Sequence, residues 1–310
     1  MVFQNTLKKY VMASGIGLHT GARVTIKLHP APVDSGIRFV RTDLDPVALI
    51  PANIGYVTET SLATTVGNAA GSVSTIEHLM AAFFGMGIDN AIVEIDGPEV
   101  PIMDGSAYPF VAMIKQVGLS SQKAPRRYIE ILEPVTVSSG DKTVTISPCD
   151  SLYVSVGIDF DHPMIARQQF DSRVTPHIFE RRISRARTFG FLKEVEYLKE
   201  NGLALGGCLD NALVLDDKTI LNQDGLRFSD EFVRHKALDL IGDIYLLGNP
   251  VLGKIDSFKS GHAIHHLLSK ELLNRPYTWR LVELDAERPA DPWAVQAISG
   301  EKGIFTSVSV

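Results

Sequence analysis

The feature that most constrains the fold of this 310-residue chain is a pattern that occurs twice. From residue 74 to 117 the sequence predicts a helix, a glycine-bearing turn, a strand, a second glycine turn and another helix. The same order is predicted from residue 230 to 273. The later helix opens at Gly105-Ser106 in the first half and at Gly261-His262 in the second. We interpret this as an internal duplication, with chance similarity of the two stretches as the alternative.

A duplication of this kind predicts an α+β fold of two similar domains, each a β-sheet packed on helices, with a cleft between them. The length also favours about two domains. The polar, proline-bearing stretch 118–127 is the best boundary candidate. We therefore expect an N-terminal domain over 1–122, a C-terminal domain over 127–275 and a tail over 276–310. Strands are expected at 24–28, 37–41, 90–96, 128–137, 142–146, 152–160 and 251–258, and helices at 74–84, 106–117, 230–247 and 263–273.

Composition excludes several classes of protein. The formal net charge of −6 argues against nucleic acid as the main partner. Arginines clustered at 181–187 suit a phosphate-bearing ligand better than a polymer. Cys149 and Cys208 are too few for a disulfide framework. Because the first residues lack an apolar core of signal-peptide length, and no apolar run is long enough to span a bilayer, we expect a cytoplasmic protein without a transmembrane segment.

Four histidine and acidic positions form a candidate metal site. Glu77 and His78 are adjacent, whereas His235 and Asp239 are four residues apart and project from the same face of a predicted helix. Two histidines and one carboxylate are a suitable three-ligand set for a zinc ion that keeps one position open for water. Glu77, beside a ligand, stands where a general base would be needed.

Each of these motifs also has a structural interpretation. The segment Ser74 to Glu77 matches a capping box, in which Glu77 bonds back to the Ser74 amide. His235 and Asp239 would alternatively form a solvated ion pair on an amphipathic helix. Apolar neighbours on both sides of Asp239 weaken that alternative, because an unpaired buried carboxylate is costly.

A third histidine stands at the turn that opens the last predicted helix. His262 on this turn could reach across a cleft, where Asp243 would hold it in the cationic form. The alternative is an ordinary turn histidine, which is our interpretation of His265 and His266.

Long segments of the chain resemble, in the same order, the UDP-3-O-acyl-N-acetylglucosamine deacetylase family of lipid A biosynthesis in Gram-negative bacteria. These segments are 15–21, 74–79 with 87–90, 101–107, 183–191, 222–243 and 259–263. The resemblance covers nearly the whole chain and is weakest at its C-terminal end. It implies two α+β domains of like topology with the active site between them, and one catalytic Zn²⁺ ion, with Fe²⁺ as an alternative.

The resemblance also implies roles for individual residues. The metal ligands would be His78, His235 and Asp239. Glu77 would be the general base and His262, held by Asp243, its cationic partner, while Thr188 and Lys236 would bind the developing oxyanion. The fatty acyl chain is expected in an apolar passage lined by Leu18, Phe189, Phe191, Leu192, Val195, Ala204, Gly207, Cys208, Leu209 and Val214. The uridine diphosphate is expected near Lys142, Asp159, Phe160 and Lys259.

The function implied by the resemblance is zinc-dependent hydrolysis of the 2-acetamide of UDP-3-O-acyl-N-acetylglucosamine, with release of acetate. The alternatives are a metal-dependent deacetylase of another N-acetyl sugar and a non-catalytic metal-binding protein. Structural zinc usually has four protein ligands, so three favour an open catalytic site. We expect a monomer with a nucleotide-sugar substrate. The sequence does not determine the acyl-chain length, the native metal or the roles of Asp104 and His19. It also does not determine whether His262 or Glu77 donates the proton to the leaving amine.

Overall fold

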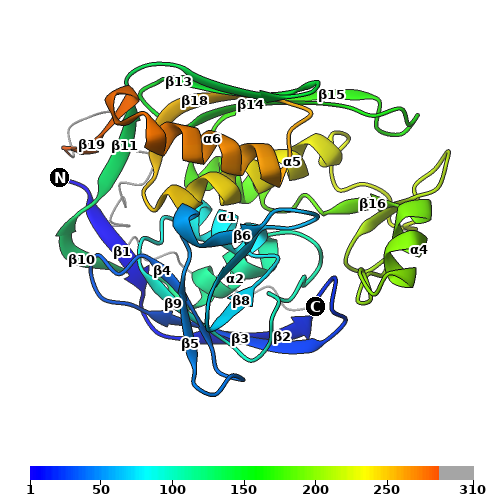
Figure 1. Cartoon of the computed structure of the whole chain (residues 1–310), viewed down its shortest axis with the longest axis horizontal. Helices are drawn as coiled ribbons and strands as arrows, with labels where there is room; N and C mark the ends of the chain where they lie inside the picture. Colours follow the sequence, from blue (N-terminus) through cyan, green and yellow to red (C-terminus); the bar gives the residue numbers. More distant parts are fainter. Residues whose placement is uncertain (286–310) are drawn as a thin grey trace, which may run out of the picture.

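The computed structural model describes residues 1–285 and has a mixed α+β architecture. Two β-sheets form outer layers, and helices α1, α2, α5 and α6 lie between them (Figure 1). The N-terminal half supplies the sheet at the bottom of that view, and the C-terminal half supplies the sheet at the top. None of the described helices combines the length and apolar character needed to cross a lipid bilayer.

The N-terminal sheet has the strand order β2-β3-β9-β4-β5. Strand β9 is antiparallel to β3 and parallel to β4, and the outer strands β2 and β5 are antiparallel to their neighbours. Along β3, Val24, Ile26 and Leu28 are buried while the residues between them are more exposed, as the alternating sequence predicts. The bounds are β2 (Val11–Ile16), β3 (Arg23–Pro30), β4 (Ile37–Arg41), β5 (Ala48–Pro51) and β9 (Ala91–Ile95).

The C-terminal sheet repeats this arrangement with β12, β13, β18, β14 and β15. Its central strand β18 is antiparallel to β13 and parallel to β14, and the outer strands β12 and β15 are antiparallel to their neighbours. Two further strands, β11 and β19, extend the sheet beyond β18. The bounds are β11 (Arg127–Ile131), β12 (Val135–Ser139), β13 (Lys142–Pro148), β14 (Tyr153–Asp159), β15 (Arg167–Arg173), β18 (Val251–Phe258) and β19 (Trp279–Glu283).

The helices complete the repeat. In each half the central strand follows one helix and precedes another, which are α1 and α2 around β9, and α5 and α6 around β18. Strand order, strand direction and helix placement therefore agree between the halves. The predicted α+β class and the predicted duplication are confirmed. The bounds are α1 (Glu77–Met86), α2 (Tyr108–Val117), α5 (Glu231–Ile244) and α6 (His262–Asn274).

Helices α1 and α5, which precede the central strands β9 and β18, pack directly against each other. A Cβ atom at Gly242 of α5 would lie 2.1 Å from the carbonyl oxygen of Glu77, so a larger residue would force the helices apart. Gly85 of α1 similarly accommodates Phe179, whose ring would lie 2.0 Å from a Cβ atom there. This close contact places the start of α1 beside the last turn of α5.

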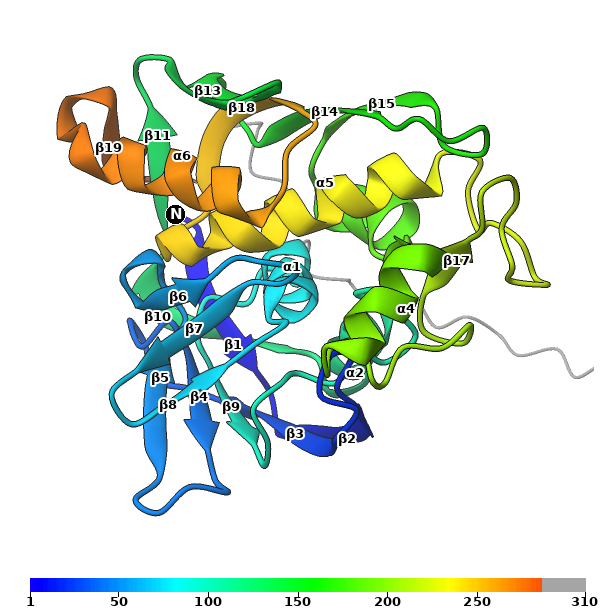
Figure 2. The same ribbon diagram turned by 45° about the vertical axis from the view of Figure 1, so that its right-hand side comes forward.

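The remaining elements are short and lie around this central stack. Strands β16 and β17 pair in parallel, and α4 follows β16 on one side of the molecule (Figure 2). These elements are β1 (Phe3–Leu7), η1 (Ile54–Tyr56), β6 (Val57–Glu59), β7 (Thr65–Asn68), β8 (Gly71–Val73), β10 (Leu119–Pro125), α3 (Pro176–Ile178), the π-helix η2 (Phe179–Ile183), β16 (Phe189–Phe191), α4 (Leu192–Glu200), β17 (Leu213–Leu215), η3 (Tyr245–Leu247) and η4 (Pro276–Thr278).

Several element boundaries differ from the predictions. The strand expected over 128–137 is divided into β11 and β12, because Pro134 between them has no N–H group to continue a ladder. The helix expected over 230–247 ends at Ile244, and a 3₁₀ turn stopped by the left-handed Gly248 follows it.

The polar stretch expected as a boundary contains a strand. Strand β10 pairs with β1, a long-range contact that local composition does not reveal. In the predicted tail, η4 and β19 are ordered, and β19 is antiparallel to β11. Residues 286–310 of that tail lie outside the described part of the chain.

Candidate metal centre and active site

Three potential metal ligands from both halves converge where α1 meets α5. His78 lies in the first turn of α1, and His235 and Asp239 lie one turn apart on α5. Oδ1 of Asp239 lies 3.2 Å from Nε2 of His235 and 3.6 Å from Nε2 of His78. The three donor atoms lie within 4.8 Å of one another, and all three residues are buried. This convergence matches the ligand set expected from the sequence.

The chemistry of these donors fits a divalent cation. Nδ1 of His235 donates a hydrogen bond to the carbonyl oxygen of Ala186, 3.0 Å away, which directs Nε2 toward the group. Burial lowers the pKa of His235 to about 3, so the imidazole is neutral at physiological pH. Burial alone would raise the pKa of Asp239, but His235 and Lys236 hold it well below its usual range. Its buried Oδ1 accepts no hydrogen bond from any described residue, as expected of a metal ligand.

Glu77 lies beside this group and is buried. Its Oε2 accepts a hydrogen bond from the backbone N–H of Thr64 at 3.1 Å, and its Oε1 lies 4.0 Å from Nε2 of His262. Burial raises the pKa of Glu77, although His262 and His78 oppose the shift. A carboxylate that is less acidic than usual is better suited to accept a proton.

The capping-box interpretation of Glu77 is wrong. Helix α1 begins at Glu77, and Ile76 in the cap position makes no side-chain cap. Thr75 adopts a φ of 56°, and its Oγ1 donates a hydrogen bond to the buried Glu99. The Ser74 hydroxyl donates to the carbonyl oxygen of Pro98 instead of capping the helix. The chain therefore turns sharply before α1, which leaves the Glu77 carboxylate directed at the metal-ligand group.

His262 and Asp243 form a buried ion pair. Nδ1 of His262 donates to Oδ2 of Asp243 at 2.8 Å, as proposed from the sequence. Burial opposes the charge on His262, but Asp243 and then Glu77 raise its pKa to about 10. Oδ1 of Asp243 accepts a hydrogen bond from the hydroxyl of Thr64 at 2.6 Å. His262 is thus a cation next to the Glu77 carboxylate, with its Nε2 facing the site.

The two expected oxyanion contacts lie on different elements, Lys236 on α5 and Thr188 directly before β16. Nζ of Lys236 donates to Oδ2 of Asp239 at 2.9 Å and lies 5.4 Å from the centre of the Phe189 ring. Burial would lower the pKa of Lys236, but Asp239 raises it, so the amine stays charged. Thr188 precedes Phe189 at the start of β16, and its backbone N–H donates to the carbonyl oxygen of Gly105 at 2.8 Å.

A buried ion pair connects the segment just before β16 to α5. Glu231, which is fully buried in the first turn of α5, accepts hydrogen bonds from the Arg187 guanidinium and from the backbone N–H of Arg187. Arg185 and Arg182 lie over the rings of Tyr108 and Phe170. The expectation that arginines 181–187 form a phosphate-binding patch is therefore wrong for Arg187, whose charge is used inside the protein.

We expect Glu231→Ala to destabilise the protein by about 3–5 kcal/mol, because it leaves the buried Arg187 charge unpaired. Urea unfolding followed by circular dichroism measures this loss. The matched control is Asp217→Ala, which breaks an exposed ion pair with Lys193 and should leave the unfolding midpoint nearly unchanged. A midpoint for Glu231→Ala equal to that of the control would contradict this account of the pair.

An apolar cavity of about 400 Å³ opens beside Thr188. It lies between α4, β16, β17 and the loop after β2, and both His19 and Leu62 also border it. Of the residues expected to form a passage, it is lined by Leu18, Phe189, Leu192, Val195, Ala204, Gly207, Cys208, Leu209 and Val214. Phe191 does not line it and contacts Phe160 and His162 in a neighbouring cavity of about 630 Å³.

The four residues expected near a uridine diphosphate lie at one end of the C-terminal sheet. Nζ of Lys259 lies 3.4 Å from Oδ2 of Asp159. Phe160, the next residue, borders the cavity of about 630 Å³. Lys142 is the first residue of β13. The next residue, Thr143, pairs with Phe258, which directly precedes Lys259.

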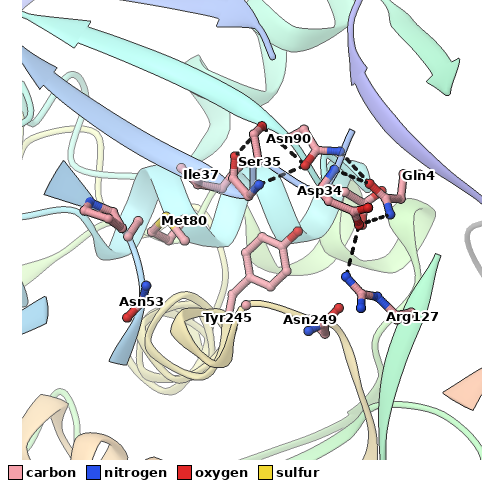
Figure 3. A pocket seen from close by; sticks show the side chains of 15 residues that line it. Gln4, Asp34, Ser35, Ile37, Asn53, Met80, Asn90, Arg127, Tyr245 and Asn249 are labelled. Carbon is pink, nitrogen blue, oxygen red and sulfur yellow. Dashed lines mark hydrogen bonds and ion pairs between the residues drawn. The ribbon is translucent and has the colours of Figure 1, made fainter. Parts of the chain in front are cut away.

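Another cavity, of about 240 Å³, lies between the two halves and shares no lining residue with the metal-ligand group. Gln4, Asp34 and Asn90 line its N-terminal side, and Arg127 and Tyr245 line its C-terminal side. Figure 3 shows that Gln4, Asp34, Asn90 and Arg127 are hydrogen-bonded to one another. Because these polar groups satisfy each other, we interpret this cavity as part of the joint between the halves.

Two residues near the site were missed by sequence reasoning. Thr64 contacts both Glu77 and Asp243, and no motif marks it. His265 was interpreted as an ordinary turn histidine, which is wrong, because it is fully buried and hydrogen-bonded to Asp243. Its position three residues after His262 on one helix was the available signal.

Two residues left open by the sequence have defined positions. Asp104 accepts hydrogen bonds from the backbone and hydroxyl of Ser106 and forms an ion pair with Arg227 at 2.9 Å. It therefore belongs to the turn before α2. His19 borders the apolar cavity, and its backbone N–H donates to the buried Glu99 at 2.9 Å.

The fold and the site together define a class of enzyme, a metal-dependent hydrolase with a buried carboxylate beside its metal-ligand group. The family model for UDP-3-O-acyl N-acetylglycosamine deacetylase (LpxC) matches residues 4–274. A protein from Myxococcus xanthus is 53% identical over 279 residues, covering 90% of this chain and 89% of that protein. One from Shewanella violacea is 49% identical over 293 residues, covering 94% and 96%. Both relatives are named UDP-3-O-acyl-N-acetylglucosamine deacetylase. This chain belongs to the UDP-3-O-acyl N-acetylglycosamine deacetylase family.

Proposed function

We propose that this protein is a zinc deacetylase that hydrolyses the 2-acetamide of UDP-3-O-acyl-N-acetylglucosamine, releasing acetate in an early step of lipid A biosynthesis. The observation that carries the proposal is the group of His78, His235 and Asp239, with the Glu77 carboxylate and the His262 cation beside it. Membership of the deacetylase family supports the identity of the substrate. The apolar cavity that begins at Thr188 supports the presence of an acyl chain.

Each residue of the group has a chemical role in this proposal. His78, His235 and Asp239 would hold the zinc ion, which when bound would supply Lewis acidity to activate a water and polarise the acetyl carbonyl. Glu77 accepts the proton of the attacking water. Lys236 and Thr188 stabilise the negative charge that develops on the carbonyl oxygen.

Protonation of the leaving amine requires a donor, and His262 and Glu77 both qualify. The pKa of His262 is raised to about 10, so this group is protonated at neutral pH. Glu77 is protonated after it has accepted the proton from water. Asp243 accepts the hydrogen on Nδ1 of His262 and leaves Nε2 directed at the site.

Substrate recognition is assigned to the two cavities beside this group. We assign the cavity of about 400 Å³ to the acyl chain. The uridine diphosphate is assigned to Lys142, Asp159, Phe160 and Lys259, where Phe160 borders the cavity of about 630 Å³ and supplies an aromatic ring for the base. Phe191 contacts Phe160 and is assigned to the same side of the substrate.

Metal analysis combined with acetate release from a substrate panel tests this function. The purified protein should contain one zinc equivalent per chain and release acetate from the 3-O-acylated UDP sugar. Equal activity on other N-acetyl sugars would favour a general deacetylase. A tightly bound metal without any acetate release would favour a non-catalytic metal protein.

We expect the pH dependence of kcat/KM to be bell-shaped. Activity should fall at low pH as Glu77, whose pKa is raised by burial, becomes protonated. It should fall again at high pH as His262 loses its proton near pH 10. A bound divalent cation lowers both pKa values and so moves the bell to lower pH.

The variant His262→Gln checks the assignment of the high-pH limb. Glutamine has no proton to lose in this range, so the variant should be slower but should lack the descending limb. Persistence of that limb in His262→Gln would assign it to a different group.

We expect the apolar cavity to discriminate substrates by acyl chain. Burial of each CH₂ group contributes about 0.8 kcal/mol, so losing the chain should lower kcat/KM by orders of magnitude. A Cβ atom at Gly207 would lie 3.3 Å from the carbonyl oxygen of Ala204 and 3.6 Å from Cδ1 of Leu18, so Gly207→Ser requires a small local shift and narrows the cavity. Ala204→Leu is a less clean probe, because Ala204 has a φ of 52°, which disfavours larger side chains.

The comparison is made with 3-O-acylated and unacylated UDP-N-acetylglucosamine. Gly207→Ser should reduce kcat/KM for the acylated substrate and leave the unacylated one almost unchanged. Equal kcat/KM for both substrates in the wild type would remove the acyl chain from the proposal.

Three further properties belong to this proposal. We place the domain boundary at 122–127, with a second domain over 127–275 and a tail over 276–310. The two free cysteines are consistent with the reducing environment of the cytoplasm. We expect a monomer, because the metal-ligand group is complete within one chain.

A further inference from the structure

A second imidazole shares the Asp243 carboxylate with His262. Nδ1 of His265 lies 2.7 Å from Oδ2 of Asp243, the same oxygen that Nδ1 of His262 contacts at 2.8 Å. The remaining oxygen, Oδ1, accepts the hydrogen bond from Thr64. His262 and His265 stand three residues apart on one face of α6, which faces α5 at this point. One buried carboxylate is thus held by three side-chain donors.

The far side of His265 is also bonded. Its Nε2 lies 2.9 Å from the hydroxyl oxygen of Ser260, which in turn contacts the hydroxyl of Ser257 at the end of β18. A carboxylate oxygen only accepts hydrogen bonds, so Nδ1 of His265 donates to Asp243, while the Ser260 hydroxyl can bond Nε2 as either donor or acceptor. Ser260 follows Lys259, a residue assigned above to the uridine diphosphate. The hydrogen bonds therefore run from that turn to the Asp243 carboxylate.

We propose that His265 is a positioning residue, which fixes the Asp243 carboxylate and thereby the ring of His262, and which connects both to the turn at 259–261. It contacts no reacting atom and acts through Asp243. Without the donor at His265, the carboxylate would keep only its contacts with His262 and Thr64, and its orientation would be less firmly fixed. A misplaced His262 lowers the rate, because proton transfer depends on geometry at the scale of about 1 Å.

Two other interpretations of His265 are distinguishable. Asp243, His262 and His265 form a compact group of potential metal ligands. However, both imidazoles direct Nδ1 at one carboxylate oxygen at hydrogen-bond distance, which satisfies these groups without a metal. The other interpretation is a core histidine that stabilises α6 without affecting catalysis.

Replacement by asparagine and by leucine separates these interpretations. The side-chain nitrogen of asparagine is as many bonds from Cβ as Nδ1 of histidine, so His265→Asn keeps a donor toward Asp243 and loses the Ser260 contact. His265→Leu loses both. The matched control is His266→Asn, the neighbouring histidine on α6, whose buried Nδ1 has no hydrogen-bond partner among the described residues.

The inference rests on the proposed function for its kinetic test. His265→Leu should lower kcat roughly 10- to 100-fold, with KM and zinc content unchanged. His265→Asn should recover most of kcat, and His266→Asn should match the wild type. In NMR spectra of the zinc-loaded protein, His262 and His265 should give two imidazole N–H signals shifted downfield by their bonds to Asp243. His265→Leu should remove one of them and displace the other.

Several results would overturn the inference. The first is a kcat for His265→Leu within about twofold of the wild type. The second is a kcat for His265→Asn as low as that of His265→Leu, and the third is a loss of zinc in either variant. If His265→Leu does not fold, Ser260→Ala should still lower kcat and displace the His265 signal, and no change in either would reject the proposal. Absence of acetate release by the wild type would reject the proposed function, while the NMR comparison would still test the role of His265.

Discussion

His78→Ala, His235→Ala and Asp239→Ala should each purify without a stoichiometric metal and without measurable deacetylase activity. Each change removes one of three donors that lie within 4.8 Å of one another, and two donors hold a divalent ion far less tightly than three. Elemental analysis of the purified variants measures the metal. Circular dichroism shows whether each variant is folded.

Two controls accompany these variants. Wild-type protein treated with a chelator should lose activity and regain it with one equivalent of zinc. Asp243→Asn, one turn beyond Asp239 on α5, should retain the metal, because Asp243 lies outside the ligand group although it contacts His262. Stoichiometric tight zinc in any of the three ligand variants would show that the ligand assignment is incorrect.

Glu77→Ala should keep the metal and lose about 10²–10⁴-fold in kcat, the usual size of a general-base contribution. The carboxylate lies beside the ligand group but does not belong to it, so its removal leaves all three donors in place. Glu77→Gln should be similarly slow. Glutamine retains an oxygen for the hydrogen bond from Thr64 but cannot accept a proton at neutral pH.

The pair of variants distinguishes chemistry from structure. If Glu77 served only to hold Thr64 and the start of α1, Glu77→Gln would be nearly as active as the wild type. A rate near normal in Glu77→Ala would mean that the base is another group. Measurement of kcat together with zinc content for both variants decides between these outcomes.

Local sequence was sufficient where a feature depended on residues close together in the chain. The spacing of His235 and Asp239 predicts that both face one side of a helix, and α5 bears this out. The alternation in β3 and the glycine turns around β9 and β18 similarly predict elements that the structure contains. The α+β class and the duplication followed from the order of those elements.

Local sequence was misleading where a distant partner decided the conformation. The segment from Ser74 to Glu77 satisfies the capping-box pattern, but Thr75 is in the left-handed region and bonds to Glu99. The stretch 119–125 has the composition of a linker, yet it forms β10 because β1 supplies its hydrogen bonds. In both places a tertiary contact outweighed a local preference that is worth only about 1 kcal/mol.

The sequence by itself determined which residues could be ligands, base and cation, since residue type and helical spacing are properties of the chain. Only the tertiary structure decided that His78, from one half, meets His235 and Asp239 from the other. That meeting depends on Gly242, which lets α1 approach α5 until a Cβ atom would lie 2.1 Å from the Glu77 carbonyl oxygen. The environment of Asp243 was likewise decided by packing, because Thr64 comes from the N-terminal half and His262 and His265 come from α6. Burial keeps His235 neutral, whereas the Asp243 and Glu77 carboxylates make His262 a cation against the effect of burial, and both environments exist only in the folded protein.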